Sequence, residues 1–192
     1  MHIGIDFDNT IACYDELFHR ICREAGLIPS DIPANKSDVR NYLREQGRED
    51  DWTEIQGLVY GPRITEASPF PGVIEFIRAA RSCDIPVSII SHKTRHPYRG
   101  EKHDLHAAAR NFLEHHEIKT DTVHLEPTKE AKADRIRSQG CTHFIDDLPE
   151  FLALVSLEND GQRILFDPND LYEDSLDWQR HRSWQSIAEA VL

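Results

Sequence analysis

The sequence predicts an α/β protein with a doubly wound parallel sheet and a small helical insertion after the first strand. Two observations support this prediction: short β-prone runs alternate with stretches of helical periodicity, and a polar helical region interrupts the alternation directly after the first run. Alternating strands and helices imply parallel strands covered by helices on both faces. We expect a core of residues 1–12 and 69–192, and a helical insertion at 13–68 that packs over the site as a lid.

Apolar patterning places the expected elements along the chain. Nearly continuous β-branched or apolar runs bounded by polar residues predict buried strands, and these are the run that ends at Asp6 and residues 85–90, 122–125, 141–145 and 163–166. Apolar residues at three- and four-residue spacing predict helices at 15–26, 37–47, 51–60, 72–83, 105–113, 128–138, 149–155 and 183–192. Prolines punctuate the insertion and the segment that follows it.

Composition excludes several classes of protein. Hydrophobic residues make up 39% and charged residues 29% of the 192, as in soluble globular domains. The net charge of −12 argues against general binding to nucleic acid or to anionic membranes. No apolar run approaches the roughly 18 residues of a membrane span. Four scattered cysteines are expected to be free thiols, and since the chain opens on a core strand we expect no signal peptide and a cytoplasmic location.

Asp6 and Asp8 stand at the end of the first expected strand. Strand side chains alternate between faces, so the two carboxylates point the same way if the strand geometry persists. Carboxylates this close repel each other unless a cation or a shared proton intervenes, and Mg²⁺ is a hard ion that prefers such oxygen ligands. The alternative interpretation of this pair alone is a capped turn.

Acids or a hydroxyl also follow two later strands, namely Ser91 and the pair Asp146 and Asp147. In a doubly wound sheet these strand ends lie at one edge, where such proteins bind their ligands. With a lysine between the second and third positions, the ordered set resembles the haloacid dehalogenase superfamily, whose motifs are D-x-D, a Ser or Thr, a Lys and a paired acid. The resemblance covers residues 1–12 and roughly 70–168.

The residues and the resemblance together suggest a division of roles. A carboxylate at Asp6 can attack phosphorus, and Asp8 can protonate the leaving group and later accept a proton from water. The resemblance implies that Ser91 and Lys132 contact the phosphoryl group, with Lys129 one turn earlier left open as an alternative lysine. It also implies that Mg²⁺ is held by four aspartates, Asp8 through its backbone carbonyl: Asp6, Asp8, Asp146 and Asp147.

A basic loop after Ser91, residues 92–104, offers local positive charge in an acidic chain. Its alternative interpretation is a solvated loop. Near the expected phosphate site, the candidate substrate-binding residues are Asn9, His92, Lys93, Arg95, Arg99 and Lys129. The second aspartate, absent in dehalogenases that name the superfamily, favours phosphate esters.

The leading hypothesis is a Mg²⁺-dependent phosphatase of a small phosphorylated metabolite, a nucleotide or sugar phosphate, acting through an aspartyl-phosphate. The alternatives are a polynucleotide-end phosphatase, a phosphosugar mutase, or a non-catalytic binding or regulatory protein that retains the fold. The sequence does not predict an oligomeric state.

Overall fold

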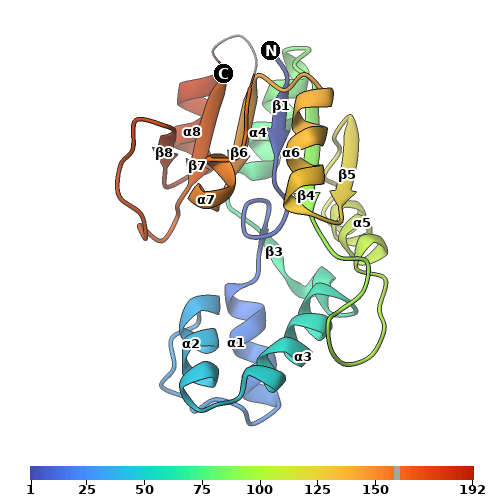
Figure 1. The fold of residues 1–192 in the computed structure, drawn as a ribbon, viewed down its shortest axis with the longest axis vertical. Helices are drawn as coiled ribbons and strands as arrows, with labels where there is room; N and C mark the ends of the chain where they lie inside the picture. The colour runs from blue at the N-terminus through green and yellow to red at the C-terminus, as the bar shows by residue number, and fades with distance from the viewer. Residues whose placement is uncertain (158–160) are drawn as a thin grey trace. The chain divides into compact units, whose positions relative to one another are not determined.

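The computed structural model describes residues 1–157 and 161–192 and divides into two compact units (Figure 1). The core unit comprises Met1–Ala12, Pro69–Lys93 and Glu117–Leu192, and the helical unit comprises Cys13–Ser68 and Thr94–His116. The predicted insertion at 13–68 therefore falls in the helical unit. Residues 94–116, which the sequence analysis placed in the core, group with that unit as well.

Within the described residues the core unit contains a six-stranded sheet, and β2 and β3 form a separate pair. The strands are β1 (Ile3–Ile5), β2 (Ala12–Cys13), β3 (Ser68–Pro69), β4 (Val87–His92), β5 (Thr122–Glu126), β6 (His143–Asp146), β7 (Gln162–Phe166) and β8 (Gln179–His181). The sheet order is β5-β4-β1-β6-β7-β8, and every pairing in it is parallel. The predicted α/β class and parallel sheet are confirmed.

Helices of the core unit cover both faces of this sheet, and these are α4 (Val73–Ser82), α6 (Lys129–Ser138), α7 (Pro149–Leu152) and α8 (Trp184–Val191). The helical unit contains α1 (Asp15–Glu24), α2 (Lys36–Glu45), α3 (Glu49–Tyr60), α5 (Leu105–His115) and a 3₁₀ turn η1 (Ile64–Glu66). Figure 1 shows α6 and α7 in front of the strands and α4 behind them. No helix among the described residues is long and apolar enough to cross a membrane.

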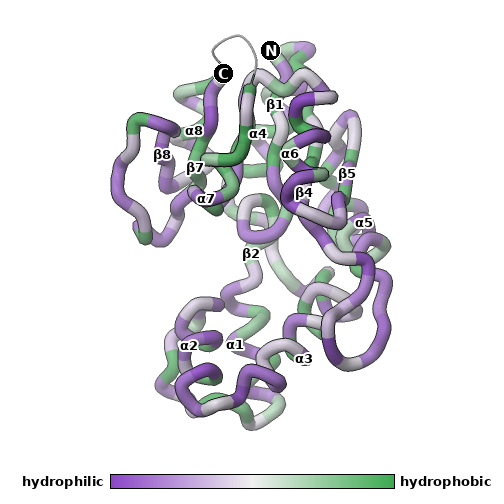
Figure 2. The backbone as a smooth tube through the Cα atoms, viewed as in Figure 1, coloured by the Kyte–Doolittle hydropathy of each residue, from purple (hydrophilic) through white to green (hydrophobic). Residues whose placement is uncertain are grey.

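Two apolar layers hold the helices to the sheet. On one face, Ile136 of α6 and Phe151 of α7 pack with Phe144 of β6 in a buried cluster. On the other, the Trp184 ring of α8 lies 5.0 Å from Phe76 of α4 and 5.5 Å from Phe166 of β7. Alternate residues of the central strands supply both layers, which explains why β1 is apolar throughout (Figure 2) and why β4 is buried up to its last residue. A core closed on both faces holds the strand ends in fixed positions.

The helical unit has its own core. Its centre is aromatic, because Phe18 of α1 stacks on Trp52 of α3 at 4.7 Å and meets Tyr60 at 5.6 Å. Residues 94–116 join this unit because α5 packs against η1 and α3, and because Gly57 of α3 lets Pro97 approach closely. A Cβ at position 57 would lie 2.9 Å from the Pro97 ring.

Several predicted boundaries shift slightly. Strand β4 continues one residue past Ser91 to His92, and β6 begins at His143 rather than at Cys141. Helix α7 ends at Leu152, where the prediction extended to Val155. Strand β8 was not predicted because Gln179–His181 is short and polar, as edge strands often are. All four cysteines are free, as predicted.

Gly4 in the middle of β1 is required by close packing. A Cβ there would lie 2.6 Å from the buried ring of Phe144 on the adjacent strand. We expect Gly4→Ala to lower the free energy of unfolding by about 1–3 kcal/mol, because the added methyl overpacks the core. Urea denaturation measures this, with Gly26→Ala as a comparison that meets no atom within 4 Å but carries its own cost from a positive φ. A fully stable Gly4→Ala variant would contradict the packing.

Candidate active site

Strand order brings the predicted site residues to one edge of the sheet. β1 lies between β4 and β6, and the Asp6 backbone N–H donates to the Ile145 carbonyl at 2.9 Å. The chain proceeds from β1 to β4 and β5 on one side and then crosses to β6 on the other. Ligands bind α/β sheets at such a reversal, beyond the carboxyl ends of the strands. Asp6 and Asp146 are therefore neighbours at the expected position.

A tight turn after β1 exposes the second aspartate. The Phe7 carbonyl accepts hydrogen bonds from the backbone N–H groups of Ile11 and Ala12, each at 3.0 Å. Asn9 adopts a left-handed conformation with φ 58°, which asparagine tolerates better than most residues. The turn keeps Asp8 and Asn9 at the edge of the sheet instead of continuing the strand.

Three carboxylates lie close together, and a buried ammonium bonds to two of them. Ligand atoms of Asp6, Asp146 and Asp147 all lie within 4.8 Å of one another. The Lys132 Nζ donates to Asp6 Oδ1 and to Asp146 Oδ2, at 2.5 Å each. Lys132 and Asp146 are almost fully buried, at 3% and 0% exposure. The site is thus a desolvated patch with more negative than positive charge.

Local structure fixes each member of this cluster. Thr128 caps α6 by accepting from the Ala131 N–H at 3.1 Å, which sets the first turn that carries Lys132. Asp146 Oδ1 accepts from the Leu148 N–H at 2.9 Å, which turns the chain beyond β6. Pro149 then opens α7. Asp146 therefore both shapes the turn after β6 and belongs to the carboxylate cluster.

Burial and charge act in opposite directions on the buried groups. Burial raises the pKa of Asp6 to about 7, and the Lys132 ammonium opposes that rise. Burial alone would lower the pKa of Lys132, but the carboxylates of Asp146 and Asp6 raise it above its ordinary value. Lys132 is therefore a permanent cation, and a bound divalent ion would favour the ionised form of Asp6.

Asp8 has a different cationic partner. The Lys93 Nζ donates to both carboxylate oxygens of Asp8, at 2.9 and 2.8 Å. Lys93 is only 4% exposed, although the sequence analysis treated it as part of a basic loop. Strand alternation was the overlooked signal: Lys93 directly follows β4, and a period of two from Ser91 predicts that both side chains point the same way.

Most of the predicted site residues line a small hollow of about 90 Å³ at this edge. Ser91 lines it, and its buried Oγ has no hydrogen-bond partner among the described residues. The other lining residues are Asp6, Asp8, Asn9, His92, Lys129, Lys132, Asp147, Leu148 and Phe151. His92 Nε2 lies 3.2 Å from the Pro127 carbonyl, and the Lys129 Nζ lies 3.8 Å from Glu150. Of the two candidate lysines, the structure brings Lys132 into contact with Asp6.

Arg95 and Arg99 belong to the helical unit. Arg95 pairs with Asp104 at 2.7 Å, and Arg99 pairs with Asp50 at 3.1 Å. Both ion pairs lie within that unit and account for the charges without a ligand. Their predicted contact with substrate remains a prediction.

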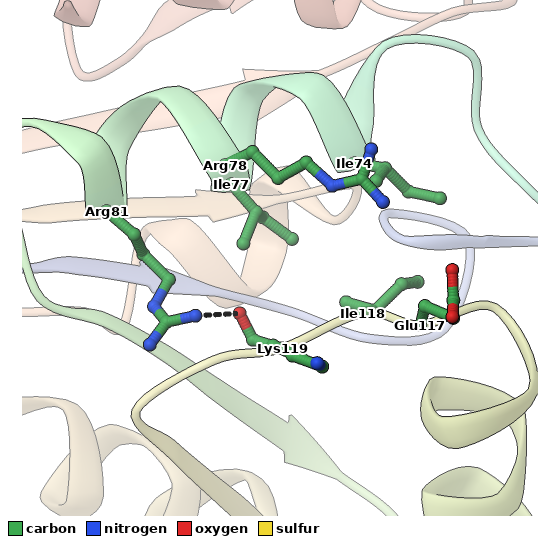
Figure 3. Close-up of a pocket in the computed structure, with 7 residues that line it drawn as sticks. All are labelled: Ile74, Ile77, Arg78, Arg81, Glu117, Ile118 and Lys119. Carbon is green, nitrogen blue, oxygen red and sulfur yellow. Dashed lines mark hydrogen bonds between the residues drawn. The ribbon is translucent and has the colours of Figure 1, made fainter.

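A larger hollow of about 170 Å³ lies elsewhere in the core unit, between α4 and residues 117–119 (Figure 3). Arg81 donates to the Lys119 carbonyl at 3.2 Å across it, and Ile77 of α4 and Ile118 of the facing segment line it (Figure 3). It contains no cluster of carboxylates and no hydroxyl or thiol side chain. We therefore assign the candidate site to the smaller hollow, where the chemistry-bearing residues converge.

Solved structures with the same architecture cover almost the whole chain. A HAD-hydrolase, YfnB of Bacillus subtilis bound to magnesium, matches with a TM-score of 0.60 and 15% identity, over 99% of this chain and 97% of its own. A HAD phosphatase from Thermococcus onnurineus matches with a TM-score of 0.54 and 13% identity, over 99% of this chain and 97% of its own. An L-2-haloacid dehalogenase matches with a TM-score of 0.58 and 12% identity, again over 99% of this chain and 97% of its own.

The chain has the haloacid dehalogenase fold. No family model matches the sequence, and no curated protein does. The fold that the resemblance implied is thus confirmed at the level of structure, while identities of 12–15% carry the fold alone. In this fold the four predicted motifs occupy adjacent strand and helix ends of the core unit.

The carboxylate cluster fits a hard divalent cation by its chemistry. Its donors are oxygens, its members lie close together, and its net charge is negative. We expect Mg²⁺ to raise the midpoint of thermal unfolding and expect Asp147→Asn to reduce that shift. Because burial raises the pKa of Asp6 to about 7, protons compete with the ion and the shift should shrink as pH falls below about 7. Differential scanning calorimetry measures the midpoint with and without Mg²⁺. An equal Mg²⁺-induced shift in the unmodified protein and in Asp147→Asn would contradict the assignment.

Proposed function

We propose that this protein is a Mg²⁺-dependent phosphatase that hydrolyses a small phosphorylated metabolite through an aspartyl-phosphate. The observation that carries the proposal is Asp8, a second aspartate held at the mouth of the site two residues beyond the candidate nucleophile Asp6. An ester leaving group needs a proton when its bond to phosphorus breaks, and a carboxyl group so placed can supply it. Phosphoryl transfer therefore uses both aspartates.

The side chains support a two-step reaction. Lys132 engages Asp6 Oδ1, and no side chain or backbone group of the described residues donates to Oδ2. Oδ2 attacks phosphorus, the bond from phosphorus to the ester oxygen breaks, and Asp8 protonates the departing alkoxide. Asp8 then takes a proton from water, the water oxygen bonds to phosphorus, and the acyl phosphate bond breaks to regenerate Asp6.

Other residues of the hollow suit the phosphoryl oxygens. The buried Ser91 hydroxyl has no hydrogen-bond partner among the described residues, and it could donate to a phosphoryl oxygen. The Lys132 ammonium provides positive charge beside the attacking carboxylate. Asp6, Asp146 and Asp147 would hold Mg²⁺, with the Asp8 carbonyl as a fourth ligand implied by the resemblance. The ion would offset repulsion between Asp6 and a dianionic phosphate.

Hydrolysis of a carbon–halogen bond is the second candidate, because one of the matching structures is an L-2-haloacid dehalogenase. A departing halide needs no proton, so dehalogenation gives no role to the acid at Asp8. The acid at Asp8 therefore favours the phosphate ester.

The substrate class that we propose is a nucleotide or sugar phosphate. A hollow of about 90 Å³ accommodates little more than a phosphoryl group, so the remainder of the substrate must extend beyond it. The net charge of −12 disfavours polynucleotide ends. We propose that the helical unit acts as the cap that selects the remainder.

A purified-protein screen tests the function. The panel contains p-nitrophenyl phosphate, nucleotides, sugar phosphates and 2-haloacids, each with Mg²⁺ and with EDTA, and the readouts are released phosphate and released halide. We expect phosphate release that requires Mg²⁺ and no halide release. Halide release without phosphate release would replace this proposal with dehalogenation, and transfer between sugar positions would indicate a mutase. If neither phosphate nor halide is released, the remaining hypothesis is a non-catalytic binding or regulatory protein.

A further inference from the structure

A buried lysine pairs with the proposed acid and base. The side chain of Lys93 is 3% exposed and that of Asp8 is 22% exposed, and the ammonium bonds to both carboxylate oxygens. Lys93 comes directly after β4, and its backbone N–H donates to the Glu126 carbonyl of β5 at 2.8 Å. Its ammonium also lies 5.4 Å from the centre of the Phe7 ring. Lys93 is therefore anchored at its backbone and enclosed along its stem.

Burying the charged Lys93 side chain costs hydration free energy, so stability alone does not readily explain this ion pair. A desolvated ammonium loses several kcal/mol of hydration, and an apolar residue of similar size often stabilises such a site as well or better. A stability role is thus a weak explanation for Lys93. The position of its partner, two residues beyond the candidate nucleophile Asp6 and lining the same hollow, suggests a role in the reaction instead.

The two aspartates of the D-x-D motif are separated by their lysines. Asp6 belongs to the cluster with Asp146 and Asp147, and it shares Lys132 with Asp146. The Asp8 carboxylate is bonded to Lys93 and is not a member of that cluster within the described part of the chain. Each aspartate therefore has its own cation.

We propose that Lys93 is a positioning residue that holds the Asp8 carboxylate apart from the cation-binding cluster and directs it toward the leaving group. This inference rests on the proposed phosphatase function for the direction of Asp8, while the separation from the cluster rests on geometry alone. Lys93 acts through Asp8 and does not itself touch the reacting atoms. The residue that the sequence analysis assigned to substrate binding thereby acquires a different role.

The proposal makes the effect of Lys93 depend on the leaving group. A p-nitrophenolate leaves readily without a proton, whereas a phenolate, with the parent pKa of about 10, benefits from protonation. Phenyl phosphate and p-nitrophenyl phosphate have almost the same shape and so isolate this difference. We expect Lys93→Met to lower kcat about 100-fold on phenyl phosphate and less than about 10-fold on p-nitrophenyl phosphate, with KM unchanged.

Three further variants show whether Lys93 acts through Asp8. In an Asp8→Asn background, adding Lys93→Met should change kcat on phenyl phosphate less than about twofold, because the partner is already lost. Lys93→Arg should restore most of the activity, since it keeps the cation. Lys119→Met, an exposed lysine of the core unit, should match the unmodified protein. A raised KM with additive effects would overturn the proposal and return Lys93 to substrate binding.

Calorimetric titration with Mg²⁺ tests the separation without any turnover. Removing the ammonium should let the Asp8 carboxylate approach the cluster, so Lys93→Met should bind Mg²⁺ roughly tenfold more tightly. The Lys93→Met, Asp8→Asn double variant should return to the affinity of the unmodified protein. Equal Mg²⁺ affinity in the unmodified protein, Lys93→Met and the double variant would show that Lys93 does not hold Asp8 away from the cluster, even if the chain hydrolysed no ester. If the titration behaves as expected and no ester is hydrolysed, it is the phosphatase proposal that fails.

Discussion

Asp6→Asn is expected to abolish the proposed phosphate ester hydrolysis, with a loss of kcat of roughly 10³-fold or more. The amide has nearly the same shape as the carboxylate but is a far weaker nucleophile, so the covalent step cannot begin. Lys132 keeps Asp146 as a partner in the variant, at 2.5 Å, and the fold should persist. Steady-state kinetics on p-nitrophenyl phosphate measure the loss, because this substrate needs little help from Asp8.

The matching control is Asp8→Asn, which alters the neighbouring aspartate of the same motif. It should reduce turnover of p-nitrophenyl phosphate far less than Asp6→Asn does, since the leaving group departs without a proton. Thermal unfolding of both variants checks that they are folded. Equal residual activity in Asp6→Asn and the unmodified protein would show that another residue attacks phosphorus.

Lys132→Met should be strongly destabilising in the absence of metal. It removes the cation shared by Asp6 and Asp146, whose side chains are 7% and 0% exposed, and leaves two adjacent buried carboxylates. Loss of one partner of a buried ion pair costs about 3–5 kcal/mol. We expect a decrease of that size in the free energy of unfolding by urea in EDTA. Adding Mg²⁺ should recover part of the loss, because the ion replaces the missing positive charge.

Lys129→Met is the control for this prediction, since it changes a lysine of the same helix. Lys129 is 40% exposed and lies 3.8 Å from Glu150, which is itself 60% exposed. Such surface pairs contribute about 0–1 kcal/mol, so the stability of this variant should barely change. Equal losses from both substitutions would contradict the contribution that we assign to the buried ammonium.

Much of the fold could be predicted because the local signals agree. The apolar runs that became β1, β4, β6 and β7 are buried on both faces, and parallel sheets favour such continuous runs. The acids and the hydroxyl follow strands that end at one edge, so parallel direction alone was enough to place them together. β8 was missed because three polar residues at a sheet edge carry no periodic apolar signal.

The ion pairs of the site depended on tertiary structure. The resemblance favoured Lys132 by its spacing from the paired acid but left Lys129 open. The contact between Lys132 and Asp6 forms because the capped first turn of α6 packs on the sheet. Lys93 resembled the rest of a charged loop, yet the chain between it and Arg95 passes from the core unit to the helical unit. Side chains at sequence separations of 85 and 126 residues formed the decisive contacts.

The most direct test of the covalent mechanism is a rapid acid quench during turnover, followed by mass spectrometry of the peptide that contains Asp6. The phosphatase proposal predicts a phosphoryl group on Asp6 that forms only with Mg²⁺ present and is absent from Asp6→Asn. Turnover with the phosphoryl group on another residue, or the same labelling in EDTA, would contradict the assignment of Asp6 as nucleophile.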